Sequence, residues 1–292
     1  MNRWPPLPLR LSRAFYKAHG LGNDYVVFEE GFVWAATPKN VARVCDPHRG
    51  IGSDGIVVLL ADRSGGIFRL RMFNPDGGEF ERSGNGLRVL GSFLSRRGER
   101  TPYTVRVGGD EVILSVHGNP SPAHDISAEM GRARTGPEAV DLDPASFGDD
   151  GLLQGPRGES LKVVPVSVGN PHLVVLTSEV TEERLAEVGP FLASHPALAH
   201  GANAQLAERV GEGRCRALIW ERGVGRTSAS GTSACAVAVA MVTSGRMQPG
   251  DMMVEMPGGE LSVRVTEELD VALRGPVEEV CDGLLAASLV TE

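Results

Sequence analysis

The segment Gly22-Asn23-Asp24-Tyr25-Val26-Val27 indicates the architecture, because a similar one, Gly169-Asn170-Pro171-His172-Leu173-Val174-Val175, occurs again later in the chain. Asn23 and Asn170 are 147 residues apart. The stretches Ser83-Gly84-Asn85-Gly86 and Ser230-Gly231-Thr232-Ser233 have the same offset, and each opens an apolar run that predicts a helix. The chain is therefore interpreted as an internal repeat.

Two further pairs of positions follow in the same order. Asn74 and Glu221 each stand nine residues before the serine, at the end of a predicted strand. Gly108-Gly109 and Gly258-Gly259 each link two strand-like stretches, as hairpin turns do. The alternative is a coincidence of glycine-rich loops. Four ordered matches favour two homologous domains of about 145 residues each, with the best cleft expected between the halves.

The pattern of apolar residues predicts the elements of both halves. Strands are expected at 25–30, 56–62, 67–73, 103–107, 111–116, 161–166, 173–177, 214–220, 253–256 and 260–265, and helices at 38–45, 83–97, 181–194 and 231–244. Hairpins dominate, so the sheets should be largely antiparallel. The helices that begin near 83 and 231 are apolar on nearly all sides, which is typical of buried helices inside a curled sheet.

Composition excludes several classes of protein. The 292 residues carry a net charge of −8 with no run of five like charges, which argues against a nucleic-acid surface. No apolar stretch reaches the length of a membrane span. The start, Met1 to Phe15, is interpreted as a short extension and not a signal peptide, because prolines interrupt it and no apolar segment follows.

The cysteines and histidines suggest neither disulfides nor metal. Four cysteines form no CxxC motif, which favours buried thiols in a reducing cytoplasm. Seven histidines show no metal-ligand spacing. Gly50-Ile51-Gly52-Ser53-Asp54-Gly55 matches GxGxxG, but a strand follows it where a dinucleotide site needs a helix, so a structural turn is expected.

The two serine motifs are the candidate binding elements. Each places a small, flexible segment at the head of a buried helix, where the first N–H groups lack intrahelical partners and attract an anion. The alternative for one motif alone is an ordinary N-cap. Two such motifs in repeated positions suggest two helix N-termini that converge on one carboxylate.

Other polar residues have simpler alternatives when each is taken singly. Asn23, Asn74, Asn170 and Asn203 are turn residues by type. Glu221 and Arg222 could pair with each other at a strand end, and a lone His172 is more often structural than catalytic.

Taken together, these segments resemble diaminopimelate epimerase, a family of amino-acid epimerases that work without pyridoxal phosphate. The matching stretches are 17–24, 50–55, 73–77, 83–86, 169–172, 201–203 and 221–225. The resemblance implies an α+β fold of two pseudo-symmetric domains, each a mostly antiparallel barrel-like sheet around a central helix. It places the N-terminal lobe at 1–131, joined by the returning segment 277–292, and the C-terminal lobe at 132–276.

The resemblance also implies the chemistry. The family interconverts LL- and meso-diaminopimelate, in lysine and peptidoglycan precursor biosynthesis, by removing a proton from one face of Cα and returning one to the other. Two cysteines do this, one at the head of each central helix, assisted by the residues that match His172 and Glu221. Here the cysteine positions are Ser83 and Ser230, and the family's Gly-Glu-Thr stands as Gly225-Arg226-Thr227. Epimerisation is therefore expected to be very slow or absent.

The substrate-holding pattern is intact by the same resemblance. The distal amino-acid end would be held by Asn23, Asn74, Asn170, Asn203 and Arg222, and the reacting end by Gly84, Asn85, Gly231 and Thr232. The expected partner is a small amino-acid substrate, with no cofactor and with a homodimer implied by the family. Two alternatives stay open: a non-catalytic amino-acid binder of the same fold, and a divergent racemase, dehydratase or isomerase.

Overall fold

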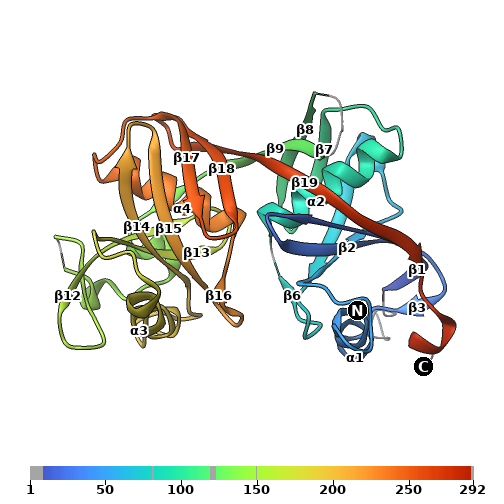
Figure 1. Ribbon diagram of the computed structural model, residues 1–292, viewed down its shortest axis with the longest axis horizontal. Coiled ribbons are helices and arrows are strands. Elements are labelled where there is room, and N and C mark those ends of the chain that lie inside the picture. Colours follow the sequence, from blue (N-terminus) through green and yellow to red (C-terminus); the bar gives the residue numbers. More distant parts are fainter. Residues whose placement is uncertain (1–8, 81, 119–122, 149, 291–292) are drawn as a thin grey trace, which may run out of the picture. The chain divides into compact units, whose positions relative to one another are not determined.

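A computed structural model describes residues 9–80, 82–118, 123–148 and 150–290 (Figure 1). The chain forms two compact units. Unit 1 contains the described residues up to Ile126 and those from Pro276 onward, and unit 2 runs from Ser127 to Gly275. The chain leaves unit 1 along β9 (His124–Arg132) and returns to it along β19 (Asp270–Leu284). Each unit is described below by itself.

The sheet of unit 1 alternates antiparallel hairpins with parallel neighbours. Its strands are β1 (Arg10–Gly20), β2 (Asn23–Glu30), β3 (Trp34–Ala35), β4 (Ile56–Leu59), β5 (Phe68–Phe73), β6 (Glu79–Phe80), β7 (Tyr103–Val107) and β8 (Asp110–His117). The pairs β1–β2, β4–β5 and β7–β8 are antiparallel, whereas β2–β4 and β5–β7 are parallel. The end of β19 adds a further antiparallel partner to β1.

Unit 2 repeats this pairing order strand by strand. Its strands are β10 (Arg134–Thr135), β11 (Leu152–Gln154), β12 (Ser160–Ser167), β13 (Pro171–Leu176), β14 (Asn203–Gly211), β15 (Arg214–Glu221), β16 (Gly225–Thr227), β17 (Gly250–Met256) and β18 (Gly259–Val265). The pairs β12–β13, β14–β15 and β17–β18 are antiparallel, and β13–β14 and β15–β17 are parallel. The same order of pairings confirms the pseudo-symmetric fold that the sequence predicted.

The helices occupy matching places in the two units. Helices α1 (Pro38–Cys45) and α3 (Glu182–Ala193) lie in the first parallel crossover of their units, and α2 (Gly84–Arg96) and α4 (Gly231–Thr243) in the second. The four helices confirm the predicted ranges to within one or two residues. A parallel pair needs a crossover connection, so each helix marks the point where the sheet departs from the antiparallel pattern.

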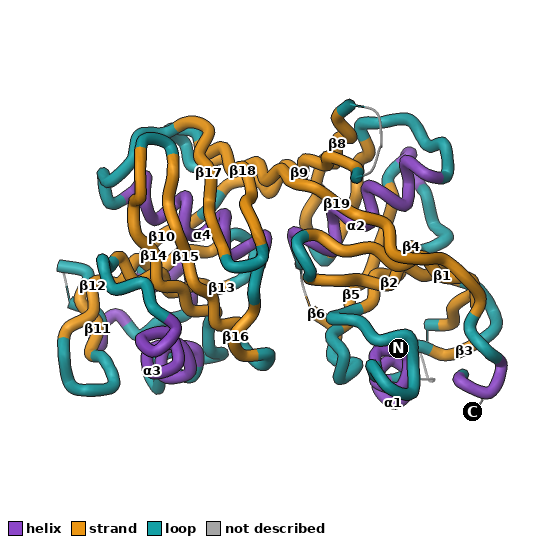
Figure 2. Tube along the Cα trace, in the orientation of Figure 1, coloured by secondary structure: helices purple, strands orange, loops and turns teal. Residues whose placement is uncertain are grey.

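The second helix of each unit lies inside a barrel-like sheet (Figure 2). Helix α4 packs against six strands of unit 2, namely β12, β13, β14, β15, β17 and β18. Every residue of α4 from Gly231 to Met241 is buried. A helix that is apolar all round is stable only where it is surrounded. The central helices therefore form the cores of their units, and their N-termini are held by the sheet.

Several strands were not predicted from the sequence. The stretch Met1 to Phe15 was interpreted as an extension, but the structure places Arg10–Gly20 in β1, where Leu11 is completely buried. That interpretation was wrong for the described part, and residues 1–8 lie outside the described residues. Strands β9, β14 and β19 were also missed. In β14 and β19 polar and apolar residues do not alternate regularly, and a strand prediction depends on that alternation.

The two expected glycine turns differ. Gly108 and Gly109 form the turn between β7 and β8, where Val107 pairs with Asp110. In unit 2, Met256 pairs with Gly259, so the turn is Pro257-Gly258 and Gly259 begins β18.

Among the described residues, the helices are too short or too polar to cross a membrane.

Candidate functional site

In unit 1, polar residues gather at one end of three neighbouring strands. The register pairs Val26 of β2 with Ile56 of β4, and Ile56 with Phe73 of β5. The residues just beyond these pairs, Asn23 and Asn74, therefore lie at the same edge of the sheet. The backbone of Asn74 forms a tight turn, with its N–H donating to Gly78 O at 2.8 Å.

Ser83 caps α2 at this same end of unit 1. Its backbone is extended, and its Oγ accepts a hydrogen bond from the N–H of Gly86 at 3.1 Å. Helix geometry directs the N–H groups of Gly84 and Asn85 out of the first turn, where they carry the positive end of the helix dipole. The cap that the sequence allowed as an alternative is therefore present, together with an anion-attracting helix end.

A directional chain of amides connects α2 to β2. Arg88 donates from Nη2 to Asn85 Oδ1, Asn85 Nδ2 donates to Asn23 Oδ1 at 2.8 Å, and Asn23 Nδ2 donates to Asp54 Oδ2 at 2.9 Å. A guanidinium can only donate and a carboxylate can only accept, so the two ends fix the orientation of both amides. Asn23 and Asn85, both predicted as substrate-binding residues, are thus brought into direct contact.

Asp54 anchors this chain at the loop before β4. The N–H of Asp24 donates to Asp54 Oδ2 at 3.0 Å, and the N–H of Asp54 donates to Asp24 Oδ1 at 2.8 Å. The packed surroundings raise the pKa of the Asp54 carboxyl. Lys17 Nζ lies 2.6 Å from Asp24 Oδ2 and holds the second carboxylate.

The GxGxxG match is a structural turn. The Gly50–Gly55 segment follows α1 and precedes β4, and the N–H of Ile51 donates to Val44 O at 2.8 Å. A dinucleotide site needs a strand before the glycines and a helix after them. The order here is helix, turn, strand, as the sequence interpretation expected.

Unit 2 builds a matching edge from β13, β14 and β15. The register pairs His172 with Asn203 and Ala204 with Trp220, so the starts of β13 and β14 meet the end of β15. Asn203 Oδ1 accepts from the backbone N–H of Arg222 at 2.9 Å, and its Nδ2 donates to Pro171 O at 3.3 Å. Asn203 thereby fixes the turn that carries Arg222.

Arg222 and Glu221 stand where β15 ends. The Arg222 guanidinium donates from Nη1 to His200 O at 2.9 Å, which folds it over the 200–203 loop. Glu221 is half-buried and pairs with Gly225 in the hairpin formed by β15 and β16. Gly201 adopts a φ of +69° below the Arg222 side chain, a conformation that favours glycine.

His172 is completely buried in unit 2. Its Nε2 lies 2.9 Å from Asn170 Oδ1, and its Nδ1 lies 3.1 Å from Gln205 Nε2. Burial, with the positive charge of Arg222 as a second cause, lowers the pKa of His172 to about 3. The ring is therefore neutral at ordinary pH, and both of its nitrogens have partners within unit 2.

The N-terminus of α4 differs from that of α2 in its cap. Ser230 is 4% exposed and has the extended backbone of an N-cap residue, but its side chain makes no capping hydrogen bond. Thr232 Oγ1 accepts from Asn170 Nδ2 at 3.3 Å. Gly231 and Thr232 thus begin the helix beside Asn170, and the predicted residues Asn170, His172 and Thr232 form one connected group.

The predicted site residues fall into two sets, each within one unit. Unit 1 holds Asn23, Asn74, Ser83, Gly84 and Asn85, and unit 2 holds Asn170, His172, Asn203, Glu221, Arg222, Ser230, Gly231 and Thr232. Sequence reasoning missed Arg88, Asp54 and Gln205 as supporting residues. A polar residue inside the short apolar run Ala204–Ala207 was the available signal for Gln205, but the strand itself was not predicted.

Arg226, in the Gly225-Arg226-Thr227 stretch, forms an ion pair within unit 2. Its guanidinium donates from Nε to Glu182 Oε2 at 2.7 Å, in the first turn of α3. Both side chains are largely exposed. Arg226 is thus accommodated at the surface of unit 2 by an ion pair.

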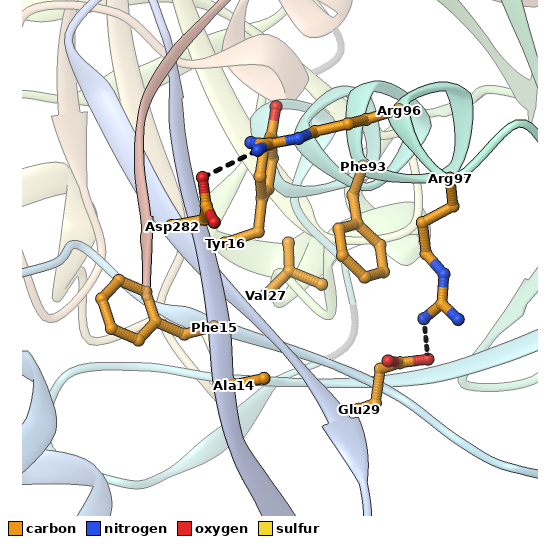
Figure 3. A pocket seen from close by; sticks show the side chains of 9 residues that line it. All are labelled: Ala14, Phe15, Tyr16, Val27, Glu29, Phe93, Arg96, Arg97 and Asp282. Atoms are coloured by element: carbon orange, nitrogen blue, oxygen red, sulfur yellow. Dashed lines mark hydrogen bonds and ion pairs between the residues drawn. The ribbon is translucent and has the colours of Figure 1, made fainter. Parts of the chain in front are cut away.

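A groove with a volume of about 230 Å³ opens elsewhere on unit 1, over β1, β2, α2 and β19 (Figure 3). Aromatic rings of Phe15, Tyr16 and Phe93 line it. Arg96 donates to Asp282 at 2.7 Å, and Arg97 pairs with Glu29. None of the predicted site residues lines this groove, and its charges neutralise one another.

No metal centre was found in the part of the chain that the structure describes. Within it, no group of three or more His, Cys, Asp or Glu side chains is arranged to hold a metal ion. The functional groups near the two helix ends are backbone N–H groups, hydroxyls, amides, carboxylates, guanidinium groups and the imidazole of His172.

Comparison with known sequences gives one family. The model of diaminopimelate epimerase matches residues 15–136 and 164–280. Diaminopimelate epimerase of Synechococcus elongatus is 34% identical over 281 residues, which cover 94% of this chain and 98% of the relative. That of Desulforudis audaxviator is 36% identical over 279 residues, covering 92% and 98%.

Comparison with solved structures gives the same fold. A hydroxyproline epimerase from Agrobacterium vitis, solved with trans-4-hydroxy-L-proline bound, superposes with a TM-score of 0.71 at 14% identity, covering 94% of this chain and 92% of the other. A phenazine biosynthesis protein from Bacillus anthracis gives 0.64 at 15% identity, covering 94% and 98%. At such identities the likeness concerns the fold alone.

Proposed function

Because the chain belongs to the diaminopimelate epimerase family, we propose that it binds diaminopimelate and moves the proton at Cα, at a rate much reduced by Ser83 and Ser230. The observation that carries the proposal is the matched pair of helix N-termini. Each has a serine in the N-cap position. In each, the side chain of an asparagine that we assign to substrate binding is hydrogen-bonded to the first turn, Asn23 in unit 1 and Asn170 in unit 2.

The reacting end of the substrate is assigned to the helix N-termini. Backbone N–H groups of Gly84, Asn85, Gly231 and Thr232 would receive the α-carboxylate. Both helices are long enough to carry a full dipole, with 13 residues each. Such preformed donors stabilise the charge that develops when Cα loses its proton.

The distal end of the substrate is assigned to the amides and the guanidinium. The proposed residues are Asn23, Asn74, Asn170, Asn203 and Arg222. Asn203 holds the backbone of Arg222, and a guanidinium grips a carboxylate with two parallel hydrogen bonds. This set selects a molecule with an amino acid group at each end.

Proton transfer is assigned to the serines, with Glu221 as the neighbouring base and with His172, which its low pKa of about 3 keeps neutral, in a supporting role. One group would take the proton from one face of Cα while the other returns a proton to the opposite face. A thiol has a reference pKa of about 8.5, whereas a hydroxyl resembles water at about 15.7. The difference of about 7 pKa units corresponds to about 10 kcal/mol in the free energy of deprotonating the catalytic group. A neighbouring base recovers only part of it.

The serines also support a second candidate, an amino-acid binder without catalysis. A protein that keeps the amides and the guanidinium but lacks both thiols would hold its ligand unchanged. A divergent racemase, dehydratase or isomerase is the third possibility. It is disfavoured because all five distal-end residues are present.

The test combines calorimetry with hydrogen exchange. Binding of meso- and LL-diaminopimelate is measured first, and exchange of the α-hydrogen is then followed in D₂O. The proposal expects binding, with exchange that is slow but faster than the uncatalysed rate. Binding without any such exchange would favour the non-catalytic binder. Rapid exchange would overturn the impairment, whereas failure to bind any diamino diacid would overturn the substrate assignment.

We also propose a cytoplasmic homodimer. Cys45, Cys215 and Cys235 are buried free thiols and Cys281 is an exposed one, which suits a reducing compartment. Sedimentation equilibrium of the purified chain tests the assembly. A mass near 31.0 kDa at all concentrations would contradict the dimer.

A further inference from the structure

Gln205 is a completely buried amide in β14 that no sequence motif singled out. Its Nε2 lies 3.1 Å from His172 Nδ1 and 3.1 Å from Ser233 Oγ in the first turn of α4. Its Oε1 is also buried, and within the described residues it has no hydrogen-bond partner. A buried acceptor without a partner is destabilising, because it loses its hydrogen bonds to water and gains none in the fold. The placement of this amide therefore needs a cause other than packing.

The two orientations of the amide differ in cost. As the structure has it, both N–H groups of Gln205 donate, one to His172 and one to Ser233, and a single acceptor is left over. With the amide turned around, the oxygen would accept from both neighbours and two N–H donors would be left over. One unpaired acceptor costs less than two unpaired donors, so the first orientation is the stable one.

This orientation determines the proton on His172. Nδ1 accepts from Gln205, so a neutral ring must carry its hydrogen on Nε2. That hydrogen is donated to Asn170 Oδ1 at 2.9 Å, which directs the Asn170 Nδ2 group to Thr232 Oγ1 at 3.3 Å. Burial keeps the pKa of His172 low and the ring neutral.

We propose that Gln205 is a positioning residue that holds His172 in its Nε2–H form and thereby fixes the Asn170 amide beside the N-terminus of α4. The only lone pair of the neutral ring, on Nδ1, is engaged by Gln205, so His172 has none left to accept a proton from Ser230. Its contribution to the site is therefore the hydrogen bond from Nε2–H that holds Asn170. The consequence for substrate binding rests on the proposed function. The position of the hydrogen on the His172 ring does not depend on the proposed function, and it is measured in a separate experiment.

The direct test is the tautomer of His172 by NMR of protein labelled with ¹⁵N-histidine. Long-range ¹H–¹⁵N correlations distinguish the two neutral forms, and loss of one ring's signals in His172→Gln assigns them. We expect the Nε2–H form of His172. An Nδ1–H form in the unaltered protein would overturn the proposal.

Two variants and one control make the cause specific. Gln205→Glu places an acceptor beside Nδ1, so His172 should gain a hydrogen there. Gln205→Met only removes the donor, so the ring should exchange between both forms. Ser233→Ala removes the other partner of Gln205 and should leave the tautomer unchanged. If Gln205→Glu does not fold, Gln205→Met decides; an unchanged Nε2–H form in it contradicts the proposal.

Calorimetry with meso-diaminopimelate tests the consequence. Gln205→Met should bind about tenfold more weakly, since Asn170 is no longer held in one orientation, whereas Ser233→Ala should change the affinity much less. If Gln205→Met binds as tightly as the unaltered protein, the positioning role is overturned. If the unaltered protein does not bind, the proposed function fails while the NMR result still decides the tautomer.

Discussion

Ser83 accepts a hydrogen bond on its Oγ from the backbone N–H of Gly86 at 3.1 Å, closing the first turn of α2. The serine in the equivalent position of unit 2 makes no such bond with its side chain. The two central helices are therefore capped differently, although both begin with Ser-Gly and occupy matching places in their units.

This difference predicts unequal stability effects for the same substitution. Ser83→Ala loses a capping bond and should lower the free energy of unfolding by about 0.5–2 kcal/mol. Ser230→Ala loses no capping bond and should cost less. Urea unfolding followed by circular dichroism measures both. An equal or larger loss in Ser230→Ala would contradict the assignment of the caps.

The buried His172 predicts a dependence of stability on pH. Its pKa is about 3 in the folded chain against an ordinary 6.5, because burial disfavours the charged ring. The unfolded chain thus binds the proton more readily. The contribution of the neutral ring is complete above pH 6.5 and is lost as the pH falls toward 3.

The measurement is urea unfolding at several pH values, with His172→Gln as the control. The loss of stability on acidification should be steeper in the unaltered protein than in the variant. Parallel curves for the two proteins over this window would show that His172 titrates normally.

Gly50 predicts a backbone clash. A Cβ at this position would lie 2.3 Å from the carbonyl oxygens of Arg43 and Val44. Gly50→Ala should therefore lower the free energy of unfolding by roughly 1–3 kcal/mol. Gly109→Ala, in the turn after β7, meets no heavy atom within 4 Å and should change it by less than about 0.5 kcal/mol. Similar thermal midpoints for the two variants would refute this account of the turn.

The ion pair of Arg226 and Glu182 should contribute little. The two side chains are 43% and 48% exposed, so solvent screens the attraction. Arg226→Gln should cost less than about 1 kcal/mol, and less still at high salt. Arg264→Gln, which removes another exposed pair, serves as the control. A loss several times larger in Arg226→Gln would show that the residue has a role beyond this pair.

The repeat made much of the fold predictable. Asn23 and Asn170, with the two serine motifs, were enough to predict the paired units, and the apolar runs after Ser83 and Ser230 predicted the central helices. Strand β14 was missed because Gln205 interrupts its apolar pattern. The parallel pairs were missed because a sequence shows that two strands exist but not which distant strand lies beside them.

The supporting contacts were not predictable for a related reason. Arg88 and Asp54 are ordinary charged residues in sequence, and their role follows from the amide chain that they terminate. The low pKa of His172 likewise depends on burial that only the packed strands provide. The residue types in the sequence identified the candidate site residues. Which group donates and which accepts each hydrogen bond, and therefore which residues support the site, could be established only from the structure.

Whether the two helix N-termini act on one Cα is measured by following exchange of the α-hydrogen of diaminopimelate in D₂O with the double variant Ser83→Cys/Ser230→Cys. This variant should incorporate deuterium and interconvert the LL and meso forms, while each single variant should stay close to the unaltered protein. A double variant that binds diaminopimelate yet incorporates no deuterium would contradict the claim that the two helix ends act on one Cα.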